Sequence, residues 1–478
     1  MKTYEELTGG EGRRVFYRAE RFRTRDLFKR SAPDLAIDGT SHELVDMSLS
    51  GLGARAAQGS NDLRSPGARV HVQLGLHGIA LFEGTGEVAR VEPTPVGTKI
   101  GLRLVDRCLN IGQLVSKYQE LLIRSDLASF VGQADSCVTP EYRTLCADMV
   151  HLMRTYRAGL ERFEATKPEP AAAADMLAAC EERILPSWRA LWRQGNALVM
   201  PIMDDPAALR ATKRFTELLI TPDFLAGAIV RRSYEKPLGY PGDFQIMNMI
   251  YDWQRVGDRL FDKLMHRLGL EPGESIVTRM VMMRQAIAKT VSQNAGRMTR
   301  VASIGSGPAR EVVDFLQLRE LPGSVQFTLV DQDHGALSHA YERTYSEVMR
   351  LRGQASVACL HASFSQLLKA GDLFGALPPQ DLIYTAGLVD YLAPRRAKAL
   401  AASLYDRLAP GGALIIGNLA KTPESCLWPL EFICDWSLVY RDERDMRALA
   451  ADLPGASVEV VHDWTGRVCV LTVRRAAA

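Results

Sequence analysis

The chain has 478 residues, a formal net charge of +2, 47% hydrophobic residues and 24% charged residues. This length exceeds what one hydrophobic core organises, so we expect a folded, globular protein with two or three domains. The nearly balanced charge gives no global electrostatic reason to expect a nucleic-acid partner.

The start of the chain and its cysteines exclude further classes. The first residues, Met1-Lys-Thr-Tyr-Glu-Glu6, lack the apolar segment of a secretory signal peptide. No apolar run reaches the roughly 18 residues of a membrane-spanning helix. The eight cysteines lack C-x-x-C spacing, which disfavours a zinc site or a disulfide framework. We therefore expect no integral membrane segment, no metal site and a cytoplasmic location.

Residues 1–107 predict a small all-β domain, either a barrel or a sandwich. Short alternating or apolar runs are separated by Gly, Pro and Asn, as expected for several short strands. The runs cover residues 44–45, 69–74, 79–82, 86–91 and 99–104. An arginine-rich segment precedes them, since residues 13–30 carry eight Lys/Arg and two acidic residues.

Two motifs in this domain favour a ligand that carries phosphate and guanine. The first is an arginine motif, Arg13-Arg14-Val-Phe-Tyr-Arg18, and the second is Asp46-Met-Ser48-Leu-Ser-Gly51. Arginine forks bind phosphate bidentately and stack on guanine faces. The aspartate can accept from a guanine edge, the serine offers a hydroxyl, and the glycine lets a ligand approach the backbone.

Together and in this order, the motifs resemble the PilZ domain, the bacterial receptor module for cyclic di-GMP. The resemblance implies a regulatory dinucleotide bound by Arg13, Arg14, Arg18, Asp46, Ser48 and Gly51. Arg21 and Arg25 form a second Arg-x-x-x-Arg pair and keep another register open. A barrel that has lost its ligand and carries only a solvated basic arm is a further alternative.

Residues 108–295 predict a helical middle region. An apolar stripe at helical spacing comprises Leu145, Met149, Leu152, Met153, Tyr156, Leu160 and Phe163. A second helix is expected over 176–192, after a Pro- and Ala-rich break that begins at Lys167. Thr221-Pro222 has the residues of a helix start. We interpret Met280, Met282 and Met283 as packing residues.

One segment of this region has the composition of a site. Lys236-Pro-Leu-Gly-Tyr240-Pro-Gly-Asp243 contains two Pro and two Gly, which predicts a rigid, irregular loop. Lys236, Tyr240 and Asp243 would project from it, and polar loops on a rigid scaffold often carry function. The alternative is a structural connection in which Asp243 caps the next helix.

Residues 296–478 predict an α/β domain with a largely parallel sheet. The expected strands are 301–304, 327–330, 356–360, 381–384, 413–416, 458–461 and 468–473, and helical segments separate the earlier ones. The last two strands are close in sequence and predict an antiparallel hairpin. The whole chain is therefore expected to be a multidomain α/β protein, with a small N-terminal β-barrel, a helical middle region and a C-terminal Rossmann-like sheet.

A glycine turn after the first of these strands indicates a nucleoside cofactor. Gly305-Ser306-Gly307 joins the strand to an amphipathic helix, and its glycines let a ligand lie against the backbone. Asp331 ends the next strand, 25 residues after Ser306. A carboxylate at about that offset hydrogen-bonds a ribose in dinucleotide-type folds.

The glycine turn, Asp331, the Pro410-Gly-Gly412 turn and the terminal hairpin together resemble class I S-adenosylmethionine-dependent methyltransferases. The resemblance covers about 180 residues and implies that S-adenosylmethionine is the cofactor. It implies a cofactor site formed by Gly305, Ser306, Gly307, Asp331, Gln332, Ala362, Ser363 and Phe364.

The fourth strand of this domain leads into a second segment expected to face substrate. It reads Tyr384-Thr-Ala-Gly-Leu-Val-Asp390-Tyr391, and ligands of open α/β sheets bind at the carboxyl ends of strands. An alcohol or amine acceptor requires a general base, for which Asp243, Asp390 and His334 are candidates, whereas an ionised carboxylate acceptor requires none. A buried tyrosine and a helix-capping aspartate are the structural alternative.

Three segments also resemble the bacterial extracellular-factor family of 3-hydroxypalmitic acid methyl ester biosynthesis. They are 236–243, 384–391 and Asp435-Trp-Ser-Leu-Val-Tyr-Arg441. This resemblance implies a small-molecule acceptor, a fatty acid carboxylate, held by Lys236, Tyr240 or Arg441 beside an acyl pocket in the helical region. The expected catalytic set is Lys236, Tyr240, Asp243, Tyr384, Asp390 and Tyr391.

Two functions from different classes follow from these motifs. The first is a methyltransferase of a small molecule that responds to cyclic di-GMP. The second is a non-catalytic signalling adaptor, in which the methyltransferase fold serves as a scaffold for a partner protein. The intact glycine turn and Asp331 favour the enzyme.

Overall fold

The computed structural model describes residues 21–28, 33–56, 65–76, 79–94, 97–118, 120, 137–367 and 378–477. The chain divides into two compact units, residues 1–134 and 135–478. The helical region and the α/β domain therefore belong to one unit, although the sequence patterns predict two separate regions. In the described part of the chain, no helix combines the length and the apolar character that crossing a membrane requires.

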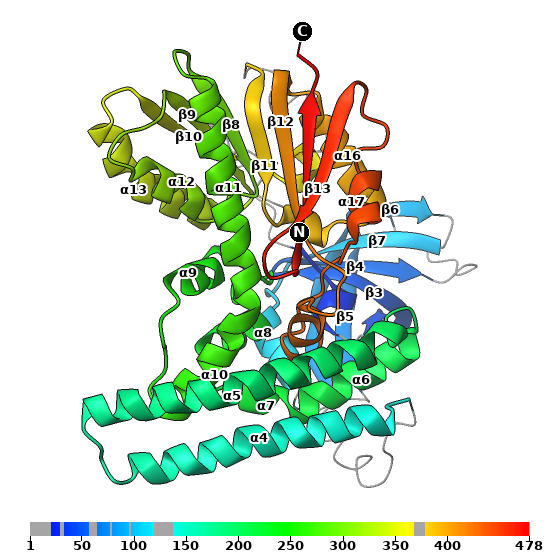
Figure 1. Cartoon of the computed structure of the whole chain (residues 1–478). Coiled ribbons are helices and arrows are strands. Elements are labelled where there is room, and N and C mark those ends of the chain that lie inside the picture. The colour runs from blue at the N-terminus through cyan, green and yellow to red at the C-terminus, as the bar shows by residue number, and fades with distance from the viewer. Residues whose placement is uncertain are drawn as a thin grey trace. The chain divides into compact units, whose positions relative to one another are not determined.

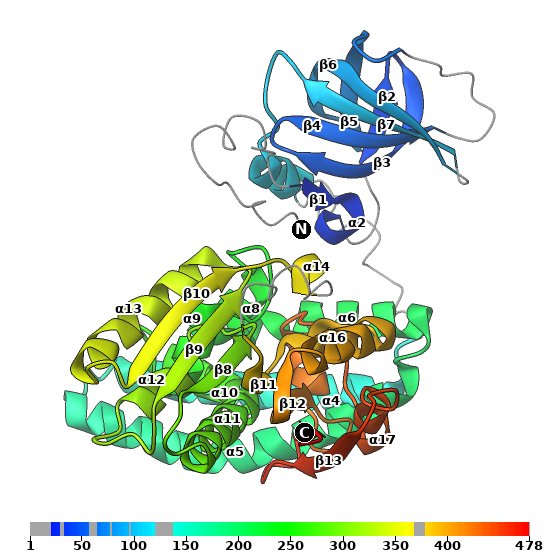
Figure 2. The ribbon, with the colours of Figure 1, turned by 90° about the horizontal axis from the view of Figure 1, so that it is seen from above.

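The first unit contains the predicted barrel, drawn in blue in Figure 2. Six antiparallel strands close in the order β2-β3-β4-β7-β6-β5, and β5 returns to pair with β2. They are β2 (Asp34–Ile37), β3 (Thr40–Ser48), β4 (Gly51–Ala56), β5 (Arg69–Leu76), β6 (Ile79–Thr94) and β7 (Gly97–Leu104). Apolar side chains that alternate along these strands fill the interior, because successive residues of a strand point to opposite faces.

Two short elements and a helix accompany the barrel. The strand β1 (Arg21–Arg23) pairs antiparallel with the end of β3, and α2 (Thr24–Leu27) follows it. Residues 111–118 are helical, and Leu114 and Tyr118 pack in the barrel core. The segment directly after the last barrel strand thus completes the first unit and does not begin the helical region.

The helical region of the second unit begins with a long pair of helices, α4 (Pro140–Glu164) and α5 (Pro170–Val199), that run side by side in Figure 1. The N-cap Thr139 accepts a hydrogen bond from the backbone of Tyr142. The helix expected over 176–192 extends further in both directions. Shorter helices follow: α6 (Pro206–Leu219), α7 (Thr221–Phe224), α8 (Ala228–Glu235), α9 (Phe244–Asp252), α10 (Leu260–Leu270) and α11 (Glu274–Gln293).

The second unit also contains a seven-stranded sheet in the order β10-β9-β8-β11-β12-β14-β13. The strands are β8 (Thr299–Ile304), β9 (Val325–Asp331), β10 (Ala355–His361), β11 (Gln380–Thr385), β12 (Leu408–Leu419), β13 (Ala456–His462) and β14 (Val468–Arg475). The first five are parallel, and β14 is antiparallel to both β12 and β13. The predicted Rossmann-like sheet and its terminal hairpin are confirmed.

Helices cover the sheet on both faces. They include α12 (Arg310–Leu316), α13 (His334–Arg350), α14 (Phe364–Leu367), α16 (Pro394–Tyr405) and α17 (Glu443–Ala448), with short turns η3 (Leu388–Tyr391) and η4 (Trp428–Ile433). One core cluster combines buried residues of the helical region with residues on one face of the sheet, such as Ile287 with Phe327. This shared core explains why the helical region and the sheet form one unit.

The strand order reverses between β8 and β11. The chain moves from β8 outward through β9 to β10, and then returns to the other side of β8 with β11. A crevice forms at the carboxyl ends of the strands at such a switch point, and it is the usual ligand site of open α/β sheets. The glycine turn and η3 both lie at this place in the topology.

Candidate active site

The glycine turn has an open face. Gly305 and Gly307 have φ angles of +67° and +52°, in the left-handed region where a side chain is strained. A Cβ added to Gly307 would have no heavy atom within 4 Å. The hydroxyl of Ser306 is buried and has no hydrogen-bond partner in the described residues. The turn thus combines a backbone that a ligand can approach with a buried polar atom that has no described partner.

Asp331 holds this turn in place. Its carboxylate accepts from the backbone N–H of Gly307 at 2.8 Å and from that of Asp333 at 2.9 Å. Burial raises the pKa of Asp331, and the backbone hydrogen bonds oppose that rise. The predicted proximity of Asp331 to the glycine turn is therefore present, and the carboxylate lines the same cavity as the turn.

A cavity of about 380 Å³ joins the predicted cofactor residues to the predicted substrate loops. Its wall contains Gly305, Ser306, Gly307, Asp331, Tyr240 and Asp390. Apolar side chains also line it, and they include Trp188, Phe224, Ile229, Val230, Leu268 and Ile433. The lining thus combines groups at the switch point of the sheet with apolar side chains that come mainly from the helical region.

Some of the other predicted cofactor residues line the cavity and others do not. Gln332 and Ala362 line the cavity. Ser363 is not part of the wall, and its hydroxyl and backbone N–H both bond the side chain of Gln366 at the start of α14. The side chain of Phe364 lies outside the described residues. Of the predicted cofactor residues at 362–364, Ala362 is therefore the one whose position in the cavity wall is described.

Of the loop at 236–243, Tyr240 faces the cavity. Its hydroxyl donates to Asp333 at 2.6 Å, and burial raises its pKa. Lys236 does not line the cavity, because its ammonium group donates to the backbone oxygen of Asp435 at 2.7 Å and to its carboxylate at 2.8 Å. Asp243 is buried, caps α9 through two backbone N–H groups, and forms an ion pair with Arg232 at 2.9 Å.

A second glycine fixes the position of this loop. Gly242 has a φ angle of +73°, and an added Cβ would lie 2.3 Å from the Trp436 ring and 2.6 Å from the Tyr391 hydroxyl. That hydroxyl donates to the backbone oxygen of Pro241 at 3.1 Å and accepts from the Trp436 indole at 3.1 Å. Three segments that are far apart in sequence therefore meet at one wall of the cavity.

Of the three site residues predicted in the segment 384–391, two line the cavity and one lies behind its wall. Asp390 and Tyr391 line the cavity. Tyr384 is fully buried behind the wall, and its hydroxyl donates to Glu311 at 2.8 Å. Asp390 accepts from the backbone N–H of Leu419 at 2.7 Å, which joins η3 to the end of β12.

The cation in the described cavity wall is one that the sequence did not single out. Arg279, on α11, donates to Asp390 at 2.6 Å and to the backbone oxygen of Ala386 at 2.9 Å through one nitrogen. Its other guanidinium nitrogens make no hydrogen bond within the described residues. Arg441, expected to hold an acceptor, is buried outside the wall and donates to backbone oxygens of Val389 and Leu392.

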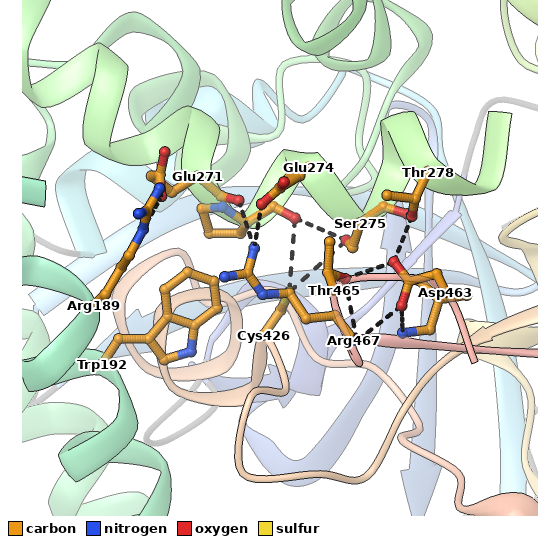
Figure 3. A network of polar contacts seen from close by, with 12 residues as sticks. Arg189, Trp192, Glu271, Glu274, Ser275, Thr278, Cys426, Asp463, Thr465 and Arg467 are labelled. Carbon is orange, nitrogen blue, oxygen red and sulfur yellow. Dashed lines mark hydrogen bonds and ion pairs between the residues drawn. The ribbon is translucent and has the colours of Figure 1, made fainter. Parts of the chain in front are cut away.

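The start of α11 is held by a network of polar contacts shown in Figure 3. Arg467, from the turn of the terminal hairpin, donates to the backbone oxygen of Glu271 and to the carboxylate of Glu274, both at 3.2 Å. Thr278 donates to Asp463 at 2.7 Å. These contacts tie the hairpin to the helix that carries the cavity's arginine. Little in the sequence singled out Arg279, since it lies in a run whose methionines pack in the core.

The barrel brings part of its predicted ligand motif together. In the pairing of β1 with β3, Arg23 lies opposite Asp46, and Arg21 lies opposite Ser48. The Ser48 hydroxyl donates to the backbone oxygen of Gly51 at 3.3 Å. Of the six predicted ligand residues, Asp46, Ser48 and Gly51 are therefore described. The other three, Arg13, Arg14 and Arg18, lie outside the described residues.

No protein-family model matches the chain, and no curated protein sequence matches it. Among solved structures, a possible exported protein from Bordetella parapertussis aligns with 65% of this chain and 99% of its own, at 17% identity and a TM-score of 0.40. Magnesium protoporphyrin IX methyltransferase from Synechocystis, with bound S-adenosylhomocysteine, aligns with 53% of this chain and 100% of its own, at 14% identity and a TM-score of 0.36.

A third solved structure is the N-methyltransferase NodS from Bradyrhizobium japonicum in complex with S-adenosylhomocysteine. It aligns with 41% of this chain and 87% of its own, at 17% identity and a TM-score of 0.29. At such identities and TM-scores, these likenesses assign neither an activity nor a substrate to this chain.

Proposed function

We propose that the second unit is an S-adenosylmethionine-dependent methyltransferase that acts on a small molecule. The observation that carries this proposal is the cavity at the switch point of the sheet, where the open face of Gly307 and the carboxylate of Asp331 meet the two predicted substrate loops. The strand order with its reversed terminal hairpin agrees with the fold that the motifs resemble.

The residues present fit this cofactor. The turn at 305–307 offers a backbone surface without side-chain obstruction at Gly307, and Ser306 offers a buried hydroxyl without a partner. In this proposal Asp331 accepts from the ribose hydroxyls, and Gln332 and Ala362, which line the same cavity, lie beside the adenine. When bound, the cofactor supplies a methyl carbon that is already activated by its sulfonium.

We propose a fatty acid carboxylate as the methyl acceptor, so that the product is a methyl ester. The apolar side chains that line the cavity suit an acyl chain, since burying such a chain removes apolar surface from water. Arg279 lines the cavity beside Asp390 and has guanidinium nitrogens left to bind a carboxylate. An ionised carboxylate attacks an activated methyl carbon without a general base.

The remaining wall residues have positioning roles in this proposal. Tyr240 and Tyr391 line the cavity and are fixed by hydrogen bonds to Asp333 and Pro241. A fixed wall aligns the acceptor with the methyl carbon and excludes water, which is most of what such a displacement needs from a protein. Lys236 and Asp243 act behind the wall, because each is bound to a partner outside the cavity. Tyr384 also lies behind the wall, and its hydroxyl donates to Glu311, which lines the cavity.

We further propose that the barrel binds cyclic di-GMP and regulates the second unit. The pairing of β1 with β3 supports this, because it leads the chain that follows the arginine motif directly past Asp46 and Ser48. A ligand shifts activity only if it binds two arrangements of the protein with different affinity. Both ligands are made inside cells, and we therefore propose that the protein acts in the cytoplasm.

Calorimetry on the full chain tests the proposal. Titration with S-adenosylmethionine and with cyclic di-GMP should give one saturable site for each. Binding of cyclic di-GMP without any binding of S-adenosylmethionine would contradict the enzyme and favour the non-catalytic adaptor. Binding of S-adenosylmethionine without binding of cyclic di-GMP would agree with the proposed enzyme but contradict the proposed regulation by cyclic di-GMP.

A further inference from the structure

The charges in the cavity wall do not balance. Its described lining contains three carboxylates, on Glu311, Asp331 and Asp390, and one cation, on Arg279. Arg279 is paired with Asp390 at 2.6 Å. Asp331 accepts from two backbone N–H groups. Glu311 is the lining carboxylate with neither a cation nor two backbone N–H groups as partners: its hydrogen bonds come from the Tyr384 hydroxyl and its own backbone N–H.

Glu311 lies in the first turn of α12, directly after the glycine turn, and is 6% exposed. Its carboxylate accepts from the Tyr384 hydroxyl at 2.8 Å. Among the described residues, this is the one side chain that donates to it, and no lysine, arginine or histidine forms an ion pair with it. The buried hydroxyl of Ser306 lines the same cavity and has no hydrogen-bond partner among the described residues.

A buried ionised carboxylate is costly unless a cation or several donors accompany it. Burial raises the pKa of Glu311 to about 7, and Asp314 on the same helix adds to the rise. Tyr384 from β11 and Tyr251 from α9 are the titratable groups that face it from other elements. Arg310, its neighbour in the chain, is already engaged with Asp314 at 2.8 Å. The cation in the described wall, Arg279, is paired with Asp390, so no described cation forms an ion pair with the Glu311 carboxylate.

We propose that Glu311 binds the α-ammonium group of the methionine moiety of S-adenosylmethionine. This inference rests on the proposed function. The ammonium supplies the missing positive charge, and the position of Glu311 next to the glycine turn places it at the methionine end of the cofactor site, while Asp331 takes the ribose end. The Ser306 hydroxyl is available to the carboxylate of the same moiety.

Three ligands separate this role from other roles. S-adenosylmethionine carries both the ammonium and the sulfonium, S-adenosylhomocysteine keeps the ammonium alone, and 5′-methylthioadenosine has neither. In Glu311→Gln, the affinities for the first two should fall by about 10- to 100-fold, the value of one charge-assisted hydrogen bond. The affinity for 5′-methylthioadenosine should not change by more than about twofold.

Glu459→Gln is the matched control, because Glu459 is exposed on β13 and does not line the cavity. All affinities are measured by calorimetry, and thermal unfolding checks that each variant is folded. Tyr384→Phe is the second variant: it removes the donor to Glu311, keeps the carboxylate, and should preserve the preference for ligands that carry the ammonium.

Equal loss for all three ligands in Glu311→Gln would overturn the proposal, since it would indicate a general change of the cavity. Loss for S-adenosylmethionine alone would also overturn it, by pointing to the sulfonium. Unchanged affinities would remove Glu311 from the site while leaving the methyltransferase in place. Failure of the unmodified protein to bind S-adenosylmethionine would instead remove the proposed function itself.

Discussion

Arg279 and Asp390 form a buried ion pair of 2.6 Å in the wall of the cavity, although they lie 111 positions apart in the sequence. The arginine comes from the helical region and the aspartate from the turn after β11. The pair therefore joins the two parts of the second unit at the point where the proposed cofactor and acceptor would meet.

Removing one partner of this pair should destabilise the protein strongly. Arg279→Met leaves Asp390 as an uncompensated buried charge, for which we expect a loss of about 3–5 kcal/mol in the free energy of unfolding. The double variant Arg279→Met/Asp390→Asn should recover most of that loss, because it removes both charges and keeps an oxygen for the backbone N–H of Leu419. Urea denaturation measures both. A loss below about 1 kcal/mol in the single variant would show that the pair is not buried as described.

Adding a methyl group to the open face of the glycine turn should block the cofactor. Gly307→Ala places a Cβ where no protein atom lies within 4 Å, at a φ angle of +52°. Gly353→Ala is the matched control, with a φ angle of +86° and equally open space away from the cavity. Both should lose about 1–2 kcal/mol of stability through backbone strain. We expect the affinity for S-adenosylmethionine to fall at least about tenfold in Gly307→Ala alone, and an equal effect in both variants would be inconsistent with a cofactor at this turn.

The stability of the protein without cofactor should depend on pH through Glu311. Burial raises the pKa of this carboxyl from 4.5 to about 7 in the folded state. The protonated carboxyl contributes about 3 kcal/mol to the free energy of unfolding. This contribution is fully present below the pKa of Glu311 in the unfolded chain and is lost as the pH rises through about 7. Glu311→Gln lacks this contribution. The stability difference between the unmodified protein and the variant should therefore shrink or reverse between about pH 4.5 and pH 8.

Denaturant titrations of both proteins at the two pH values measure that difference. If the two proteins keep the same difference at both pH values, Glu311 titrates normally and the wall is more polar than described. Saturating S-adenosylmethionine should offset the loss at the higher pH, because its ammonium would supply the charge that the ionised carboxylate lacks.

The arginine motif should determine the binding of cyclic di-GMP. Arg14→Ala and Arg18→Ala each remove a guanidinium that is expected to bind phosphate, and each should lower the affinity by about tenfold or more. Arg25→Ala tests the other register and should have a smaller effect. Calorimetry with the dinucleotide measures all three. Full affinity in Arg14→Ala and Arg18→Ala, together with loss in Arg25→Ala, would transfer the site to the second pair.

Local pattern predicted most of the fold. Alternation along short runs indicated the barrel, and the turn at 305–307 with its following carboxylate indicated the switch-point crevice. These features depend on residues that are close in sequence, because both the alternation of side chains along a strand and the conformation of a glycine turn are local. The extra length of α5 and the joining of helices and sheet into one unit depend on packing, which sequence periodicity does not report.

The roles of individual site residues were less accessible, because they depend on partners far away in the chain. Lys236 has the residue type for binding a carboxylate, but Asp435, 199 positions later, engages its ammonium. Arg279 lies on a helix whose neighbouring methionines are buried, so its position in the cavity wall had no local signal. Glu311 lies four positions after Gly307 and could have been noticed as an acid in a buried stretch.

The central claim is that this cavity supports methyl transfer to an acid. The most direct measurement incubates the full chain with S-adenosylmethionine carrying a deuterated methyl group and with free fatty acids of several chain lengths, and follows the products by mass spectrometry. We predict labelled fatty acid methyl esters and S-adenosylhomocysteine in equal amounts, with little formed by the Gly307→Ala variant. Formation of neither product above the level of heat-inactivated protein would contradict the account.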